Sequence, residues 1–419
     1  MSVGAPPRPD APARPAPDGS WREGEYYLAQ GLVLLFGFDR VYRAGATYGE
    51  IAALLTVPLW IGAFRRYRFG VTYIALGLVT VVWGLLLRDF SASDHIVNAA
   101  LSRDVSVQML GVVLGVGVIL YARSLLSPAH IGLLFGVGML ADAALNRGAW
   151  RDNPWKFALA VPVCLIVLAG AAALGRLLAQ IAALAALAVV SVALDSRAYS
   201  ATLALTAMLL VWRAARSRSA TGMTRFRVAA LIGGVAAATY FLATSLLVNG
   251  YLGRDAQART VEQIQTSGSL ILGGRPELAA TIALMKNHIG GYGVGVVPTP
   301  NDILVAKSGL AGINYAPNNG YVERYMFGGQ FELHSVIGDM WARWGLVGLA
   351  FLTLIAFIVV RSLVEAVSGG AGDVVTIFVC IWTVWNFAFS PFVVSAPVML
   401  LAVGLGLRQS RRYSANVRP

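Results

Sequence analysis

Apolar segments of about 20 residues, the length that a helix needs to cross a membrane, follow one another along most of the chain. Inside lipid every backbone amide must be paired within its own segment, which favours helices. The short alternating segments of a membrane β-barrel are not found in the sequence. The pattern therefore predicts an all-α polytopic membrane protein with about 12 transmembrane helices and one large structured extracytoplasmic loop.

The expected organisation follows directly from the positions of the apolar segments. The predicted spans lie near residues 26–38, 46–63, 69–87, 104–126, 129–146, 155–174, 176–194, 198–213, 226–249, 335–360, 374–389 and 392–407. They divide the chain into a disordered cytoplasmic tail at 1–25, transmembrane helices 1 to 9 within 26–249, the loop at 250–334, transmembrane helices 10 to 12 within 335–407, and a basic cytoplasmic tail at 408–419.

The stretch at 250–334 is the longest polar interruption of the apolar pattern. A connection of this length inside a compact protein is expected to fold on itself. Pro276 and the acid that follows it are typical of a first helical turn, so we predict a helix from Pro276 to about His288. The glycine run at 290–295 reads as a flexible turn or a helix stop, and residues 291–330 are predicted to be irregular.

The distribution of charged residues predicts how the chain is oriented in the membrane. Only 13% of the residues are charged and the net charge is +12. In a soluble protein that excess would suggest nucleic acid, but here the basic residues lie between spans, where topology and anionic lipid explain them. The strongest basic cluster, at 213–227, and the basic C-terminus predict that both termini are cytoplasmic and that the loop faces outward. No nucleic-acid partner is expected.

Two arginines interrupt this pattern at positions where chemistry is expected. Arg197 follows Asp195 and Ser196 in a turn between two apolar runs, so it is held at the outer membrane boundary. It either pairs with Asp195 or lipid phosphate as an ordinary interfacial arginine, or lines a cavity that binds an anion. Arg275 lies where the loop helix begins, and a guanidinium beside a helix N-terminus favours phosphate. The alternative for Arg275 is a surface arginine without a role.

His334 ends the loop, directly before a helix that opens with Ser335. Histidine suits a proton acceptor near neutral pH or a donor to phosphate; the alternative is an interfacial histidine without a role. Asp339 and Arg343 are four residues apart and are expected to form a helical ion pair. The chain has 4 histidines and 2 cysteines, without the spacing of a zinc site, so no metal is expected.

These places together resemble the O-antigen ligase and O-antigen polymerase (Wzy-like) superfamily of polytopic bacterial glycosyltransferases. The resemblance rests on three motifs in order: Ser196-Arg197-Ala198, Gly273-Gly274-Arg275 leading to Gly293-Val294-Gly295, and His334-Ser335 followed by Trp344-Gly345-Leu346-Val347-Gly348-Leu349. Ser335 stands where the family usually has asparagine.

The resemblance implies a metal-independent, inverting glycosyltransferase without a cofactor. It would polymerise or ligate glycan from an undecaprenyl-diphosphate-linked donor onto an acceptor sugar, at the outer face of the bacterial cytoplasmic membrane. Arg197 and Arg275 would stabilise the departing diphosphate, and His334 would accept the acceptor's proton or hold the diphosphate. The residues expected to bind substrate are Asp195, Ser335, Tyr292, Tyr321, Tyr325, Arg324 and Asp339. Partners would be the donor, the glycan acceptor, membrane lipids and chain-length or export proteins.

Two other classes remain open from the sequence. A lipid-linked oligosaccharide flippase would place charged or broken helices near the bilayer midplane and show repeated halves. A non-catalytic scaffold or sensor would not need arginines held at the interface. The glycosyltransferase hypothesis makes a spatial prediction that the others do not: Arg197, Arg275 and His334 should converge on one cavity.

Overall fold

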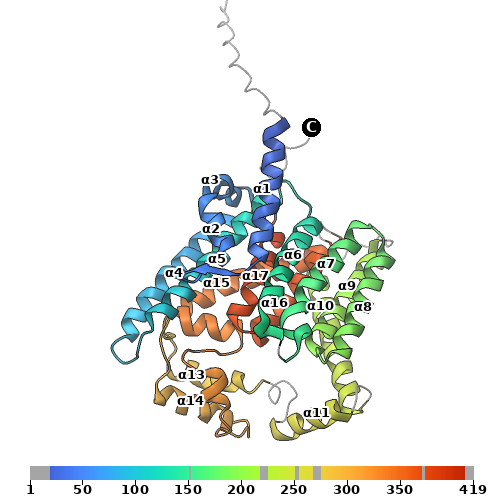
Figure 1. Cartoon of the computed structure of the whole chain (residues 1–419). Helices are drawn as coiled ribbons and strands as arrows, with labels where there is room; N and C mark the ends of the chain where they lie inside the picture. Colours follow the sequence, from blue (N-terminus) through green and yellow to red (C-terminus); the bar gives the residue numbers. More distant parts are fainter. Residues whose placement is uncertain are drawn as a thin grey trace, which may run out of the picture.

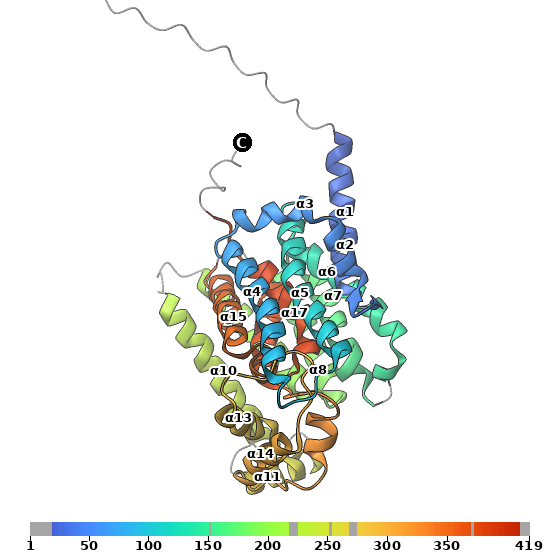
Figure 2. The ribbon, with the colours of Figure 1, turned by 90° about the vertical axis from the view of Figure 1, so that its left-hand side faces the viewer.

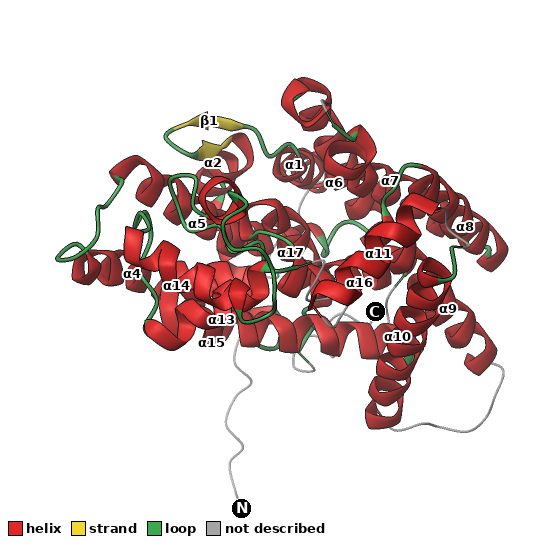
Figure 3. Ribbon diagram, turned by 90° about the horizontal axis from the view of Figure 1, so that it is seen from below, coloured by secondary structure: helices red, strands yellow, loops and turns green. Residues whose placement is uncertain are grey.

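The computed structural model describes residues 19–150, 152–217, 225–250, 254–267, 275–369 and 373–410. Helices dominate these residues, and a short two-stranded hairpin accompanies them (Figure 3). Six described helices are long and apolar enough to cross a membrane, which agrees with the predicted class of helical membrane protein. They are α4 (Gly70–Ser91), α5 (Ala99–Ala122), α6 (Pro128–Leu145), α7 (Ala160–Ala173) with the π-turn η3 (Trp155–Leu159), α9 (Arg197–Ser217) and α15 (Val336–Val367).

Four further helices of the helical body follow the remaining predicted spans of the central and C-terminal chain. They are α8 (Leu177–Ala193), α10 (Arg225–Val248), α16 (Val374–Phe389) and α17 (Phe392–Gly406). α5 and α17 lie in the middle of the body (Figures 1 and 2), and most of their side chains are buried. α1 begins, and the described chain ends, at one end of the body, whereas the loop helices lie at the opposite end, the loop side (Figures 1 and 2).

The N-terminal region differs from the prediction in two ways. α1 (Gly19–Gly37) begins inside the expected disordered tail at 1–25, of which residues 1–18 lie outside the described chain. The expected span at 46–63 is not one helix. A hairpin of β1 (Val41–Arg43) and β2 (Ala46–Thr47) leads instead into three short helices: α2 (Tyr48–Leu55), α3 (Val57–Trp60) and the 3₁₀ helix η1 (Ile61–Arg66).

Local chemistry explains why the helix breaks. Thr47 and Glu50 form a capping box that starts α2. Thr56 leaves the helical conformation, with φ −106° and ψ 14°, and Pro58, which follows within the first turn of α3, offers no N–H to continue the α2 ladder. Apolar content alone predicted a span here, and the polar cap and the proline overrode it.

The loop contains more helix than expected. Its described helices are α11 (Arg254–Ser267), α13 (Glu277–Asn287), α14 (Pro300–Ala311) and the π-turn η4 (Val322–Met326). α13 agrees with the predicted helix from Pro276 to about His288. The prediction of irregular structure across 291–330 is wrong for α14, which Thr299 and Asp302 start with a capping box and Pro300 at its first turn.

The glycine run does more than stop a helix. Residues 291–296 are buried, and the segment 290–297, here called the anchor segment, runs between the helical body and the loop helices. Gly293 has φ +106°, and a Cβ there would lie 2.3 Å from the backbone nitrogen of Arg88. Only glycine allows this approach.

Backbone hydrogen bonds fasten the anchor segment to three elements. Val294 N–H donates to Gly84 of α4 (3.2 Å), Gly295 C=O accepts from Asn98 before α5 (2.8 Å), and Tyr292 N–H donates to Ala342 of α15 (2.8 Å). The half of the loop from 275 to 334 is therefore attached at its middle to the helical body.

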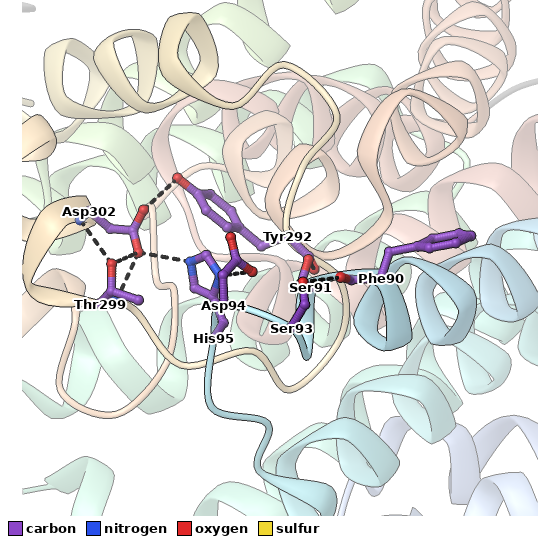
Figure 4. Close-up of polar contacts among 8 residues, drawn as sticks. All are labelled: Phe90, Ser91, Ser93, Asp94, His95, Tyr292, Thr299 and Asp302. Atoms are coloured by element: carbon purple, nitrogen blue, oxygen red, sulfur yellow. Dashed lines mark hydrogen bonds and ion pairs between the residues drawn. The ribbon is translucent and has the colours of Figure 1, made fainter.

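A side-chain network reinforces this attachment (Figure 4). His95, in the α4–α5 connection, lies between two carboxylates: Nδ1 is 2.8 Å from Asp94 and Nε2 is 3.0 Å from Asp302. Asp302 also accepts from the Tyr292 hydroxyl (3.0 Å) and the Thr299 hydroxyl (2.6 Å). Burial raises the pKa of Asp302, but hydrogen bonds from Thr299, Tyr292 and His95 outweigh it, so the pKa lies below its usual value.

Candidate functional site

A cavity of about 640 Å³ lies among α6, α7, α9, α16 and α17, where the loop meets the helical body. Its lining includes Arg197, Arg275 and His334, which come from three separate parts of the sequence. The three residues thus converge on one cavity, as the sequence predicted. The rest of the lining has a polar group and an apolar group. The polar group is Lys156, Asp195, Ser196, Asn386 and Ser390. The apolar group is Met139, Phe157, Ala158, Val161, Pro162, Ala198, Tyr199, Trp382, Trp385, Phe389, Pro391, Val394 and Val398.

Arg197 stands on a tight turn between α8 and α9. Asp195 adopts a left-handed backbone (φ +52°), and Ser196 N–H donates to Ser191 C=O at 2.7 Å, which closes the turn. The guanidinium of Arg197 lies 3.7 Å from Asp195. The pairing proposed as the ordinary alternative therefore exists, but both partners also line the cavity, and each is more than a third exposed.

Arg275 reaches the cavity from the start of α13. Its guanidinium donates to Glu277 at 3.1 Å and lies 6.0 Å from the centre of the Phe389 ring on α16. Glu277 is 1% exposed, and its second oxygen accepts from the Tyr321 hydroxyl at 3.0 Å. A buried carboxylate held from both sides thus fixes the arginine. Gly273 and Gly274, which belong to the motif around Arg275, lie outside the described residues.

His334 is held by its backbone and by one ring nitrogen. Its φ is +50°, a left-handed conformation that is unusual for a residue with a side chain. Nδ1 lies 3.0 Å from the carbonyl oxygen of Glu332. Because a carbonyl can only accept, Nδ1 carries the proton, and in the neutral ring Nε2 then has a free lone pair. The arrangement leaves Nε2 as a proton acceptor.

Asp339 does not form the predicted ion pair and does not line the cavity. It is fully buried, and its two carboxylate oxygens accept from the backbone N–H groups of Leu333 (2.9 Å) and Phe392 (2.8 Å). Arg343 instead donates to Phe331 C=O at 3.3 Å. The substrate-binding role expected for Asp339 is therefore wrong. The residue joins the turn that carries His334 to the start of α17.

Ser335 is likewise structural. Its side chain is 1% exposed and accepts from Gly338 N–H at 3.0 Å, which caps α15. It does not line the cavity.

The expected sugar-stacking surface of tyrosines is not at the cavity. Tyr292 is fully buried, with His288 stacked on one face (4.6 Å) and Phe331 at 4.2 Å, so no face is left for a sugar. Tyr321 is committed to Glu277. Tyr325 and Arg324 are exposed on η4 but do not line the cavity. Tertiary contacts explain the positions of Tyr292 and Tyr321, and spacing along the sequence does not reveal these contacts.

Several cavity residues were not predicted. Lys156 places a further cation at the cavity, and α16 supplies Trp382, Trp385, Asn386 and Phe389. An asparagine inside an apolar span was a readable signal, because polar groups at membrane depth usually face a cavity or a partner. The tryptophans carried no such signal, since spans often end in aromatic residues.

The cavity is therefore amphipathic. Lys156, Arg197, Arg275 and His334 give it a basic polar part, and side chains of α6, α7, α16 and α17 give it an apolar part. Such a site suits a ligand with an anionic head and a hydrocarbon tail.

Within the described residues, no group of three or more His, Cys, Asp or Glu side chains is placed to hold a metal ion. No protein-family model, no curated protein and no solved structure matches the chain.

Proposed function

We propose that this protein is a glycosyltransferase of the O-antigen ligase and polymerase type. It transfers glycan from an undecaprenyl-diphosphate-linked donor to a sugar hydroxyl at the outer face of the bacterial cytoplasmic membrane, for cell-surface polysaccharide such as exopolysaccharide. One observation carries the proposal: Arg197, Arg275 and His334, widely separated in sequence, line the same amphipathic cavity.

The residues divide the chemistry between them. In the transfer, the bond between the anomeric carbon and the diphosphate oxygen breaks, and a bond forms between that carbon and the acceptor hydroxyl. The hydroxyl proton passes to Nε2 of His334, which is left free by the hydrogen bond of Nδ1. The diphosphate leaves with the electron pair of the broken bond. Attack from the side opposite the leaving group inverts the anomeric centre.

The leaving group gains charge as it departs, and fixed cations stabilise that charge. Arg275 is the better preorganised of the two arginines, because Glu277 and Tyr321 hold its guanidinium in place. Arg197 comes from the helical body, at the start of α9. Two guanidinium groups with several donors each supply the positive charge that a metal ion supplies in other glycosyltransferases.

We infer the orientation from the basic residues between the helices, whose distribution favours cytoplasmic termini and a loop on the outside. The donor's lipid tail would then occupy the apolar part of the cavity, and its sugars would extend toward the loop. Expected partners are membrane lipids, the glycan acceptor and proteins that set chain length or export the product.

The test is glycan transfer by the purified protein in lipid nanodiscs. Lipid-linked oligosaccharide is added with and without EDTA, and product length is followed on a gel. Longer glycans that persist in EDTA, and that disappear in Arg197→Ala and His334→Ala, support the proposal. Arg324→Ala is the matched control, since this exposed arginine of the same loop does not line the cavity.

The same preparation separates the rival functions. Movement of the lipid-linked oligosaccharide across the bilayer without a new glycosidic bond would identify a flippase. Full transfer activity in both Arg197→Ala and His334→Ala would reject the site.

A further inference from the structure

Two buried polar atoms in the cavity wall have no hydrogen-bond partner. They are Oγ of Ser196, whose residue is 2% exposed, and Oδ1 of Asn386, whose residue is 3% exposed. The other unpartnered buried side-chain atoms in the described part of the chain belong to residues that do not line the cavity. A buried polar atom without a partner costs desolvation energy, so its presence in a folded protein calls for an explanation such as a bound ligand.

The two residues line the cavity from different parts of the fold. Ser196 directly precedes α9, whose first residues, Arg197, Ala198 and Tyr199, also line the cavity. Asn386 lies on α16, one turn before Phe389. The Tyr199 and Trp382 rings stack at 4.1 Å and hold the two helices together. The unpartnered atoms therefore belong to one wall of fixed geometry.

The start of α9 favours an anion. The first N–H groups of a helix have no acceptor within the helix, and its dipole places partial positive charge at this end. The Ser196 hydroxyl can donate a hydrogen bond. The Asn386 amide presents its NH₂ group to the same space after half a turn about its last side-chain bond. Both groups fit an acceptor with several oxygens, such as phosphate.

Burial separates this pair from the arginines. The side chains of Arg197 and Arg275 are each exposed by more than a third, whereas Ser196 and Asn386 are almost fully enclosed. Consider a lipid diphosphate whose hydrocarbon tail occupies the apolar part of the cavity. Its lipid-proximal phosphate would contact Ser196 and Asn386. The exposed guanidinium groups would meet the second phosphate.

We infer that Ser196, Asn386 and the first turn of α9 form an inner phosphate subsite, which binds the lipid-proximal phosphate of an isoprenyl phosphate or diphosphate. The inference rests on the proposed function for the kind of tail, but its test does not require glycan transfer. It divides the site into an inner subsite that holds the lipid-proximal phosphate and an outer pair of arginines that stabilises the charge developing on the other phosphate as its bond to the sugar breaks.

The test measures binding of farnesyl diphosphate, farnesyl monophosphate and farnesol to the full-length protein in nanodiscs. Ser196→Ala and Asn386→Leu are each expected to lower the affinity for both farnesyl phosphates about tenfold, the usual effect of losing one hydrogen bond to a charged group. The affinity for farnesol should not change. Asn386→Asp should lower the affinity for the phosphates further, because a negatively charged carboxylate would face the phosphate. Arg275→Ala should weaken the diphosphate more than the monophosphate.

Thr383→Val is the matched control. Thr383 lies one turn from Asn386 on the same helix and also has a buried hydroxyl without a partner, but it does not line the cavity. Its replacement should leave phosphate binding unchanged. Nanodiscs with and without phosphatidylglycerol, and additions of inorganic phosphate, distinguish an isoprenyl phosphate from a phospholipid headgroup or free phosphate.

Thermal unfolding provides a second readout that does not depend on affinity. Ser196→Ala and Asn386→Leu remove unpartnered polar atoms, so the ligand-free variants should unfold at the same or a higher temperature than the parent, while losing the shift produced by farnesyl diphosphate. Unchanged phosphate affinity in both variants overturns the inference and leaves the proposed function standing. A parent protein that binds farnesol and farnesyl phosphates equally would overturn both.

Discussion

The guanidinium of Arg275 lies 3.1 Å from the carboxylate of Glu277, which is 1% exposed and is held on its other side by Tyr321. The arginine that the sequence marked as a phosphate ligand thus has a buried anion that fixes its position. The carboxylate is committed to the protein, and the guanidinium retains further donors for a ligand.

This relationship predicts different behaviour for the two partners. Glu277→Gln keeps the shape but removes the negative charge that holds the guanidinium, so we expect glycan transfer to slow about tenfold, equivalent to ~1.4 kcal/mol of transition-state stabilisation. Tyr321→Phe, which leaves the ion pair intact, should have a smaller effect. Transfer rates with saturating donor provide the measurement, and a fully active Glu277→Gln would show that the pair does not position Arg275.

Arg275→Ala alone leaves the Glu277 carboxylate buried without its cation, which is strongly destabilising. We expect this variant to lose thermal stability as well as activity. The double variant Arg275→Ala/Glu277→Gln should regain the stability and stay inactive. The pair of unfolding temperatures separates the structural role of the ion pair from the chemical role of the arginine.

His334 is expected to act through Nε2. His334→Asn tolerates the left-handed backbone better than most replacements but offers no equivalent base, so transfer should fall at least about 100-fold, the lower range for a lost general base. His334→Gly also suits φ +50° and leaves space for a small molecule. Added imidazole should restore part of its activity, and should not restore Arg197→Ala. Transfer at the parent rate by His334→Asn would refute the assignment.

The anchor network predicts an acid-sensitive loop. The pKa of Asp302 lies below its usual value of 3.8, because hydrogen bonds outweigh the effect of burial. The unfolded chain therefore takes up the proton at a higher pH than the folded one. The resulting stability is present above about pH 4 and disappears as the pH falls through the folded pKa.

Asp302→Asn should remove that dependence. We expect the parent loop to become sensitive to an acid-active protease as the pH falls below about 4. The variant should be less stable by about 1–3 kcal/mol at neutral pH and change less on acidification. His95 and Asp94 contact the same network, so His95→Gln is the companion variant. An identical acid profile in parent and Asp302→Asn would exclude this carboxylate as the cause.

The glycine run offers a matched pair of substitutions. A Cβ at Gly293 would lie 2.3 Å from the Arg88 backbone nitrogen, and its φ is +106°, whereas a Cβ at Gly290 meets nothing within 4 Å. Gly293→Ala should detach the anchor segment and abolish stable folding or activity. Gly290→Ala should be tolerated. Expression level, unfolding temperature and hydrogen exchange at residues 291–297 test the contrast, and a well-folded Gly293→Ala protein would contradict it.

Several features could be predicted because they have local signals in the sequence. Charged residues that interrupt apolar runs marked Arg197 and His334, and Pro276 marked the start of α13 beside Arg275. The convergence of these residues was expected because the sequence predicts all three at the same membrane boundary. The capping box of α14 was equally local, and the expectation of an irregular 291–330 segment overlooked it.

Other features depend on tertiary partners that no local pattern reveals. Asp339 could pair with Arg343 by spacing, but backbone N–H groups from two other segments take both of its oxygens. Tyr292 has the composition of a sugar-binding residue but lies between His288 and Phe331. Lys156 lines the cavity because the fold brings η3 and the turn that carries Arg197 to the same cavity, a tertiary arrangement that has no local signal in the sequence.

The anchor segment also determines where this protein can vary. Arg275 and His334 lie on either side of a stretch that is fastened to α4, α5 and α15, and the largely exposed residues 311–318 lie between α14 and Tyr321, which holds Glu277. We therefore expect changes of length at 311–318 to leave both residues in place as long as Tyr321 keeps its position. Variation confined to 311–318 would change the exposed surface of the loop and leave the residues that line the cavity unchanged. The fold in this way separates a part of the loop that can change from the residues that line the cavity.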